Sequence, residues 1–125
     1  MWAPQDRSKQ DSTVVGGAGS NGRIGAPNLW VDYAASKGAI DSFTIGLSQE
    51  VAAEGIRVNA VRPGLIDTDI HARTGMPDRV SPAEKTIPMK RAGNPDEVAV
   101  AIVWLASPAA SYVSGAIVDV AGAVR

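Results

Sequence analysis

Residues 31–64 read VDYAASKGAIDSFTIGLSQEVAAEGIRVNAVRPG, and this stretch decides the fold class. Apolar residues recur in its first part at three- and four-residue spacing, which predicts a helix over about 31–54. This apolar stripe consists of Ile40, Phe43, Leu47 and Val51. Gly55 then stands where a helix C-cap glycine belongs. The β-branched residues 56–61 follow, and they predict a strand that ends at the Pro63-Gly64 loop.

The segments on either side continue the alternation of strands and helices. A short β-type run at 12–15 precedes the helix, and residues 116–120 predict a last strand. Between them, Asn94 as N-cap and Pro95 at the first position predict a second helix. Strands that alternate with helices favour an α/β fold with a parallel sheet.

Two segments show no sustained period. Residues 1–11 are polar, and we expect them to form an irregular N-terminus. Residues 65–92 mix glycine, proline and charges, and a segment of this length in a compact domain is usually functional or mobile. We therefore expect a lid region at about 65–92, either over a site or as a mobile loop.

Composition excludes several classes of function. A hydrophobic content of 45% with only 20% charged residues favours a packed core. The net charge of −1 gives no electrostatic footprint for nucleic acid or a membrane surface. Cysteine is absent, and the single histidine, His71, is expected to be a solvated loop residue, so we predict no metal site. No apolar run reaches membrane-span length and no secretory signal opens the chain, so a cytoplasmic location is expected.

Tyr33 and Lys37 lie four residues apart and therefore share one face of the expected helix. A tyrosine with an ordinary pKa of about 10 is a poor proton donor or acceptor at neutral pH. A cation beside the ring favours the phenolate and lowers that pKa, so Lys37 would make Tyr33 a usable general acid/base. Taken alone, this spacing is more typical of an ordinary surface pair, and the surrounding residues decide between the two interpretations.

The sequence around this pair resembles the short-chain dehydrogenase/reductase family. The stretch YAASKGAI looks like the family's Tyr-x-x-x-Lys signature, and further blocks resemble its later helices, strands and loops in the right order. These blocks are residues 33–40, 50–64, 66–68, 91–98 and 111–117. The resemblance implies the C-terminal part of a Rossmann-like doubly wound parallel sheet. Residues 12–125 would form the catalytic half, with the last three of seven strands lying next to one another.

The resemblance implies hydride transfer between NAD or NADP and a small-molecule carbonyl/alcohol substrate. Tyr33 would exchange a proton with the substrate oxygen, while Lys37 would lower its pKa and hold the nicotinamide ribose hydroxyls. Ser20, thirteen positions before the tyrosine, would hydrogen-bond the substrate oxygen, although another alignment places Gly19 there. The nicotinamide carboxamide would be contacted from the next loop by Pro63, Gly64, Ile66 and Thr68.

The family's cofactor-binding half has no counterpart before Ser12. Residues 17–22 match G-x-G-x-x-G, but Gly25 and Pro27 interrupt the helix that a dinucleotide fingerprint requires directly behind it. Two interpretations therefore remain. The chain is an oxidoreductase whose chemistry needs that half, or a non-catalytic remnant that serves as an oligomerisation module. In both, the resemblance implies a homo-oligomer formed through the helix at 33–54 and the last helix and strand.

Overall fold

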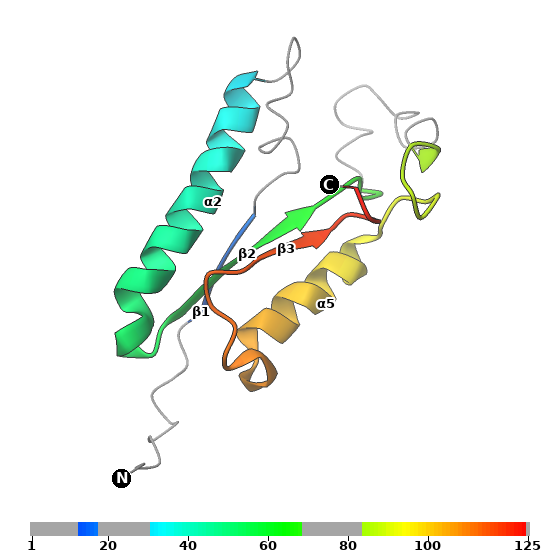
Figure 1. The fold of residues 1–125 in the computed structure, drawn as a ribbon. Helices are drawn as coiled ribbons and strands as arrows, with labels where there is room; N and C mark the ends of the chain where they lie inside the picture. The colour runs from blue at the N-terminus through cyan, green and yellow to red at the C-terminus, as the bar shows by residue number, and fades with distance from the viewer. Residues whose placement is uncertain (1–12, 18–30, 69–83, 125) are drawn as a thin grey trace.

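The computed structural model describes residues 13–17, 31–68 and 84–124. Its strands and helices alternate along the chain as the sequence predicts. In chain order they are β1 (Thr13–Gly17), α2 (Val31–Val51), the 3-10 helix η2 (Ala52–Glu54), β2 (Arg57–Pro63), α5 (Pro95–Ala106), the 3-10 helix η3 (Pro108–Ala110) and β3 (Ile117–Val120) (Figure 1). The predictions for Ser20, Gly19, His71 and the middle of the lid region lie outside the described residues.

The three strands form one parallel sheet in the order β1-β2-β3. This arrangement confirms the expectation that they are neighbours in a parallel sheet. The central strand β2 is paired on both sides, and five of its seven residues are buried. Burial of both faces is typical of a central strand in a parallel sheet that helices cover on both sides.

The helices α2 and α5 cover opposite faces of this sheet, as Figure 1 shows. Arg62 of β2 contacts Asp41 of α2, whereas Arg57 donates a hydrogen bond to the carbonyl of Leu105 in α5. Side chains five residues apart on a strand point to opposite faces, so the two arginines identify the two layers. The described elements therefore form a three-layer α/β unit.

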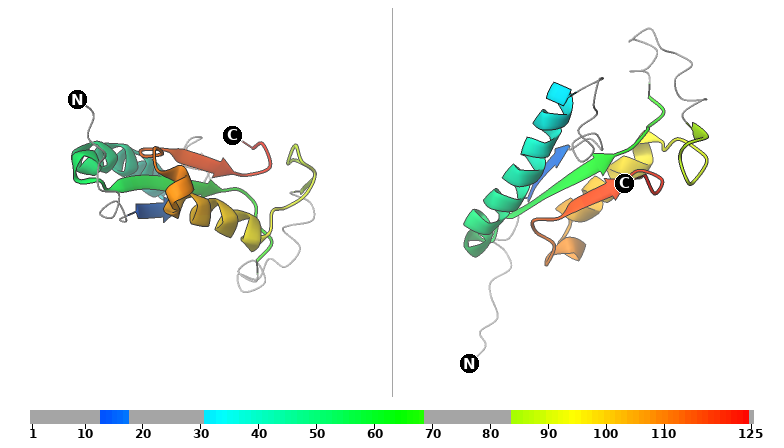
Figure 2. Two further views of the ribbon diagram at one scale, coloured as in Figure 1. Left: turned by 90° about the horizontal axis from the view of Figure 1, so that it is seen from below. Right: turned by 45° about the horizontal axis from the view of Figure 1, so that its top comes forward.

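The direction of α2 places its first turn near the carboxyl ends of the strands. In Figure 2, the start of α2 lies at the end of the molecule to which the arrowheads of β1 and β2 point. A helix that connects two parallel strands must run back along the sheet, so its first residues meet the strands' carboxyl ends. This end of the sheet is where open α/β sheets bind ligands.

The ends of both helices follow the local sequence signals. Gly55 has φ +78°, the left-handed conformation expected of a C-cap glycine, and it closes the turn after α2. At the start of α5, the Asn94 side chain accepts a hydrogen bond from the Glu97 backbone, and the Glu97 side chain accepts one from the Asn94 backbone. This reciprocal capping box satisfies two donors that a helix N-terminus leaves unpaired.

The apolar stripe of α2 is not its buried face. Phe43 is 63% exposed, and the other members of the stripe are only partly buried. The buried residues of the helix are Ala34, Thr44 and Ser48. Small side chains face the sheet because the backbones approach closely there. A Cβ atom on Gly115 would lie 2.8 Å from the Ser48 hydroxyl.

No helix in the described part of the chain is long and apolar enough to cross a membrane. The same residues contain no cluster of three or more side chains suited to hold a metal ion.

Candidate active site

The structure brings Tyr33 and Lys37 together in the first turns of α2. The Lys37 ammonium nitrogen lies 5.3 Å from the centroid of the Tyr33 ring, which is within the range of a cation–π contact. The Ser36 hydroxyl donates a hydrogen bond of 2.7 Å to the Tyr33 carbonyl. Tyr33 remains 44% exposed, so its phenol is open to a bound molecule.

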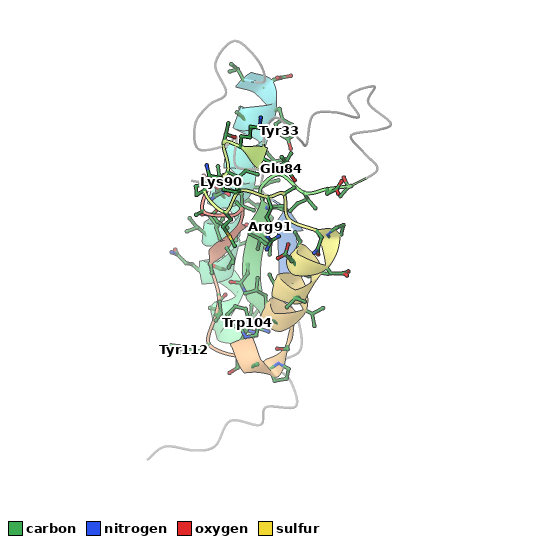
Figure 3. The ribbon with its side chains drawn as sticks, turned by 90° about the vertical axis from the view of Figure 1, so that its right-hand side faces the viewer. Tyr33, Glu84, Lys90, Arg91, Trp104 and Tyr112 are labelled. Carbon is green, nitrogen blue, oxygen red and sulfur yellow. The ribbon has the colours of Figure 1, made fainter. Side chains whose placement is uncertain are left out.

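The pair lies at the carboxyl end of the sheet. Figure 3 shows Tyr33 at the same end of the molecule as Glu84 and Lys90, whereas Trp104 and Tyr112 lie at the opposite end. The loop that follows β2 begins at this same carboxyl end, because Pro63 is the last residue of the strand. The fold thus carries Tyr33 and the loop after β2 to one end of the sheet.

The loop after β2 is held by backbone hydrogen bonds. The Gly64 amide donates to the Val120 carbonyl at 3.0 Å, and a Cβ atom on Gly64 would lie 2.8 Å from the Cα of Ala121. Farther along, the Gly93 amide donates to the Leu65 carbonyl, and the Asp67 amide donates to the Gly93 carbonyl. These bonds fix residues 64–67, so the predicted nicotinamide contacts Pro63, Gly64 and Ile66 belong to an ordered loop.

Sequence reasoning missed the ion cluster beneath this loop. Arg62 is only 2% exposed, and its guanidinium bonds to Asp41 on α2 and Asp119 on β3. Burial lowers the pKa of Arg62, but hydrogen bonds to Asp119 and Asp41 and their charges outweigh it, so the pKa is raised above its ordinary value. The available signal was Arg62 at the end of the predicted strand, since a charge that is buried there requires partners.

A cavity of about 620 Å³ opens beside the end of β3. Its walls come from Leu65, from the segment 87–97 and from residues 119–124, and they do not include Tyr33 or Lys37. In the wall of this cavity, Arg91 and Glu97 form an exposed bidentate ion pair with N–O distances of 2.7 and 2.8 Å. The hydrogen bonds from Arg91 and then from the Asn94 backbone lower the pKa of Glu97 to about 2.

The fold and this edge of the sheet define a class. A parallel sheet with helices on both faces, and a ligand-binding edge at the strands' carboxyl ends, belongs to the Rossmann-like α/β proteins. A family model described as enoyl-(acyl carrier protein) reductase matches residues 3–124. The chain belongs to the short-chain dehydrogenase/reductase family.

Known relatives support this assignment. The chain is 61% identical over 100 residues to the Escherichia coli protein named uncharacterized oxidoreductase YgfF, which covers 80% of this chain and 40% of that protein. It is similar to a Brucella melitensis short-chain dehydrogenase/reductase structure, with a TM-score of 0.83 and 38% identity over 94% of this chain and 46% of that chain. An Agrobacterium tumefaciens structure with bound NADP has a TM-score of 0.78 and 36% identity, and covers 88% of this chain and 45% of that one. The chain thus spans less than half the length of each of these relatives.

Proposed function

We propose that Tyr33 and Lys37 form the proton-transfer end of an oxidoreductase site that uses NAD or NADP to interconvert a small-molecule carbonyl and alcohol. The observation that supports this most is the Lys37 ammonium 5.3 Å from the centre of the Tyr33 ring. The Tyr33 hydroxyl gives its proton to the carbonyl oxygen in reduction and takes it from the alcohol in oxidation. Lys37 places a positive charge beside the atom where negative charge develops.

The side chains near this edge suit a nicotinamide nucleotide. The Lys37 ammonium is a hydrogen-bond donor of the kind that ribose hydroxyls accept. Pro63 is the last residue of β2, and Gly64, Ile66 and Thr68 follow it in the loop where the nicotinamide carboxamide is proposed to bind. When bound, the cofactor supplies or accepts the hydride, and Ser20 is proposed to hydrogen-bond the substrate oxygen.

Ligand titration tests the nicotinamide end directly. All proposed contacts of the chain fall on the nicotinamide and its ribose, so calorimetry should show saturable binding of reduced nicotinamide mononucleotide. Adenosine monophosphate, which lacks these groups, is expected to compete weakly or not at all. The absence of binding by the mononucleotide would overturn the assignment of this edge.

The role of Tyr33 is tested by removing one oxygen atom. Tyr33→Phe should lower turnover of a carbonyl substrate by roughly 10²- to 10⁴-fold, the usual contribution of general acid–base catalysis. Tyr112→Phe is the matched control, because Tyr112 is fully exposed at the opposite end of the molecule. Undiminished turnover by Tyr33→Phe would refute the role proposed for its hydroxyl.

A second candidate is a non-catalytic oligomerisation module. The observation that favours it is a row of exposed apolar side chains on α5, namely Val100, Val103 and Trp104. Sedimentation of the chain separates the two proposals when it is combined with the ligand titration. A stable homo-oligomer that binds no nicotinamide nucleotide would favour the module, whereas nucleotide binding would favour the oxidoreductase.

A further inference from the structure

Arg62 joins three elements of the fold through one buried side chain. One terminal nitrogen donates to Asp41 of α2 at 2.5 Å, and the other donates to Asp119 of β3 at 2.7 Å. Arg62 itself belongs to β2, where it pairs in register with Asp119. The single guanidinium therefore ties α2, β2 and β3 together on the face of the sheet that α2 covers.

On α2, the residue that Arg62 holds continues the row of the proposed site. Tyr33, Lys37 and Asp41 are spaced four residues apart, so they lie along one side of the helix. With a rise of 1.5 Å per residue, Asp41 lies about 6 Å from Lys37 and about 12 Å from Tyr33 along the helix axis. The stretch of α2 from Tyr33 to Asp41 is only about two turns long and therefore stiff, so fixing Asp41 also fixes the direction in which Tyr33 and Lys37 point.

The other arm of the cluster reaches the loop after β2. Arg62 directly precedes Pro63-Gly64, and Asp119 directly precedes Val120, whose carbonyl accepts the Gly64 amide. The same guanidinium thus lies at the base of the loop that is proposed to contact the nicotinamide. It is the only charged side chain that is buried among the described residues.

We propose that Arg62 is a positioning residue, which aligns the Tyr33–Lys37 side of α2 with the Pro63-Gly64 loop by holding Asp41 and Asp119. This inference rests on the proposed function, because the two parts that it aligns are the proton-transfer and nicotinamide ends of that site. A planar guanidinium can hold two carboxylates at a fixed angle, which a lysine ammonium cannot do. Buried ion pairs add little net stability over apolar replacements, whereas a misplacement of about 1 Å in an active site can cost about 10²-fold in rate.

Electron paramagnetic resonance tests the alignment without requiring turnover. The sequence contains no cysteine, so Ser36→Cys and Asp67→Cys, both at exposed positions, can carry a pair of nitroxide labels. One label then reports α2 beside the proposed site, and the other reports the loop after β2. With Arg62 present, a single narrow distance distribution is expected. With Arg62→Met, the distribution should broaden or shift.

Arg57→Met is the matched control for this measurement. Arg57 lies on the same strand and donates to carbonyls at the end of α5, on the other face and at the other end of the sheet. Its loss should lower stability while it leaves the label distance unchanged. An unchanged distance in folded Arg62→Met protein would overturn the positioning role.

Arg62→Met leaves Asp41 and Asp119 without the guanidinium that both of them bind, and it can fail to fold for that reason. The triple variant Asp41→Asn, Arg62→Met, Asp119→Asn removes all three charges, so no unpaired charge stays buried. It should fold and show the same broadened or shifted distance. If it also unfolds, or if it folds with the wild-type distance, Arg62 serves the fold alone and the proposal is wrong.

The two proposals fail in different ways. Failure of the wild-type chain to bind reduced nicotinamide mononucleotide would overturn the proposed function, while the label distances still decide the role of Arg62. Where turnover is measured, Arg62→Met should lower kcat about 10²-fold with a smaller change in KM, because alignment acts on the reacting geometry.

Discussion

The two helices of this chain are placed against the sheet by different kinds of contact. The shorter helix, α5, begins at a capping box between Asn94 and Glu97 and is anchored by Leu105, which is fully buried. Both features are encoded within the helix itself or in the residue before it. The start and the apolar anchor of α5 are therefore marked in its own sequence, while Arg57 of β2 adds hydrogen bonds to the carbonyls at its end.

The longer helix, α2, has no large buried apolar residue. Among its contacts are the ion pair of Asp41 with Arg62 of β2 and the close approach of Ser48 to Gly115, just before β3. The partners in both contacts lie on other elements, far along the chain. The helix that carries the proposed chemistry is thus held by specific polar and close contacts, and its apolar stripe stays at least partly exposed.

The largest effect that separates the two helices is expected from leucine truncation. Leu105→Ala should lower the free energy of unfolding by about 2–5 kcal/mol, because it leaves a cavity under α5. Leu47→Ala in α2 is the matched control substitution. It should lower the free energy of unfolding clearly less, because Leu47 is only partly buried. Urea unfolding followed by circular dichroism measures both. Equal losses of stability would show that α2 depends on an apolar anchor too.

Glycine substitutions test the close contact between α2 and the residues just before β3. Gly115 has φ +76°, and a Cβ there would meet the Ser48 hydroxyl, so Gly115→Ala should cost at least about 1–2 kcal/mol. Gly46, on the same helix as Ser48, has no atom within 4 Å of a Cβ added to it. Gly46→Ala should therefore stabilise the protein by up to about 1 kcal/mol, from helix propensity alone. Urea unfolding should show a lower stability for Gly115→Ala and a higher stability for Gly46→Ala. A loss of stability in both variants would contradict the explanation by close contact.

Much of the fold was predictable because its signals are local. The C-cap glycine at Gly55 and the N-cap at Asn94 marked helix ends from a few neighbouring residues, and both are confirmed. The spacing of Tyr33 and Lys37 was enough to place both on one side of a helix. The family resemblance supplied the order of the strands, which no local pattern contains.

The contacts that orient α2 were not predictable in the same way. Arg62 lies 21 residues from Asp41 and 57 residues from Asp119, so no spacing rule connects them. The periodic apolar residues of α2 suggested a stripe, yet Phe43 is exposed because the helix meets the sheet through small and polar residues. Periodicity reports that a helix forms, whereas its buried side depends on the partner surface.

The smallest expected effect concerns the start of α5 and depends on pH. The pKa of Glu97 is lowered from 4.5 to about 2 by its hydrogen bonds to Arg91 and the Asn94 backbone. Because the folded pKa lies below the unfolded one, Glu97 contributes stability above about pH 4.5, and that contribution is lost as the pH falls toward 2. The pair is exposed, so added salt should weaken the effect.

Glu97→Gln removes the charge while its side-chain oxygen can still accept the capping-box hydrogen bond. The variant should be less stable than the wild type at pH 7, and its stability should fall less steeply between pH 4.5 and 2. Arg91→Met should reduce the pH dependence of stability between pH 4.5 and 2 only in part, because the Asn94 amide still donates a hydrogen bond to Glu97. Urea unfolding at several pH values measures all three proteins. If the free energy of unfolding changes with pH in the same way in the wild type and in Glu97→Gln, the charge of Glu97 does not stabilise the start of α5. The hydrogen bonds of the capping box would then stabilise it without any contribution from charge.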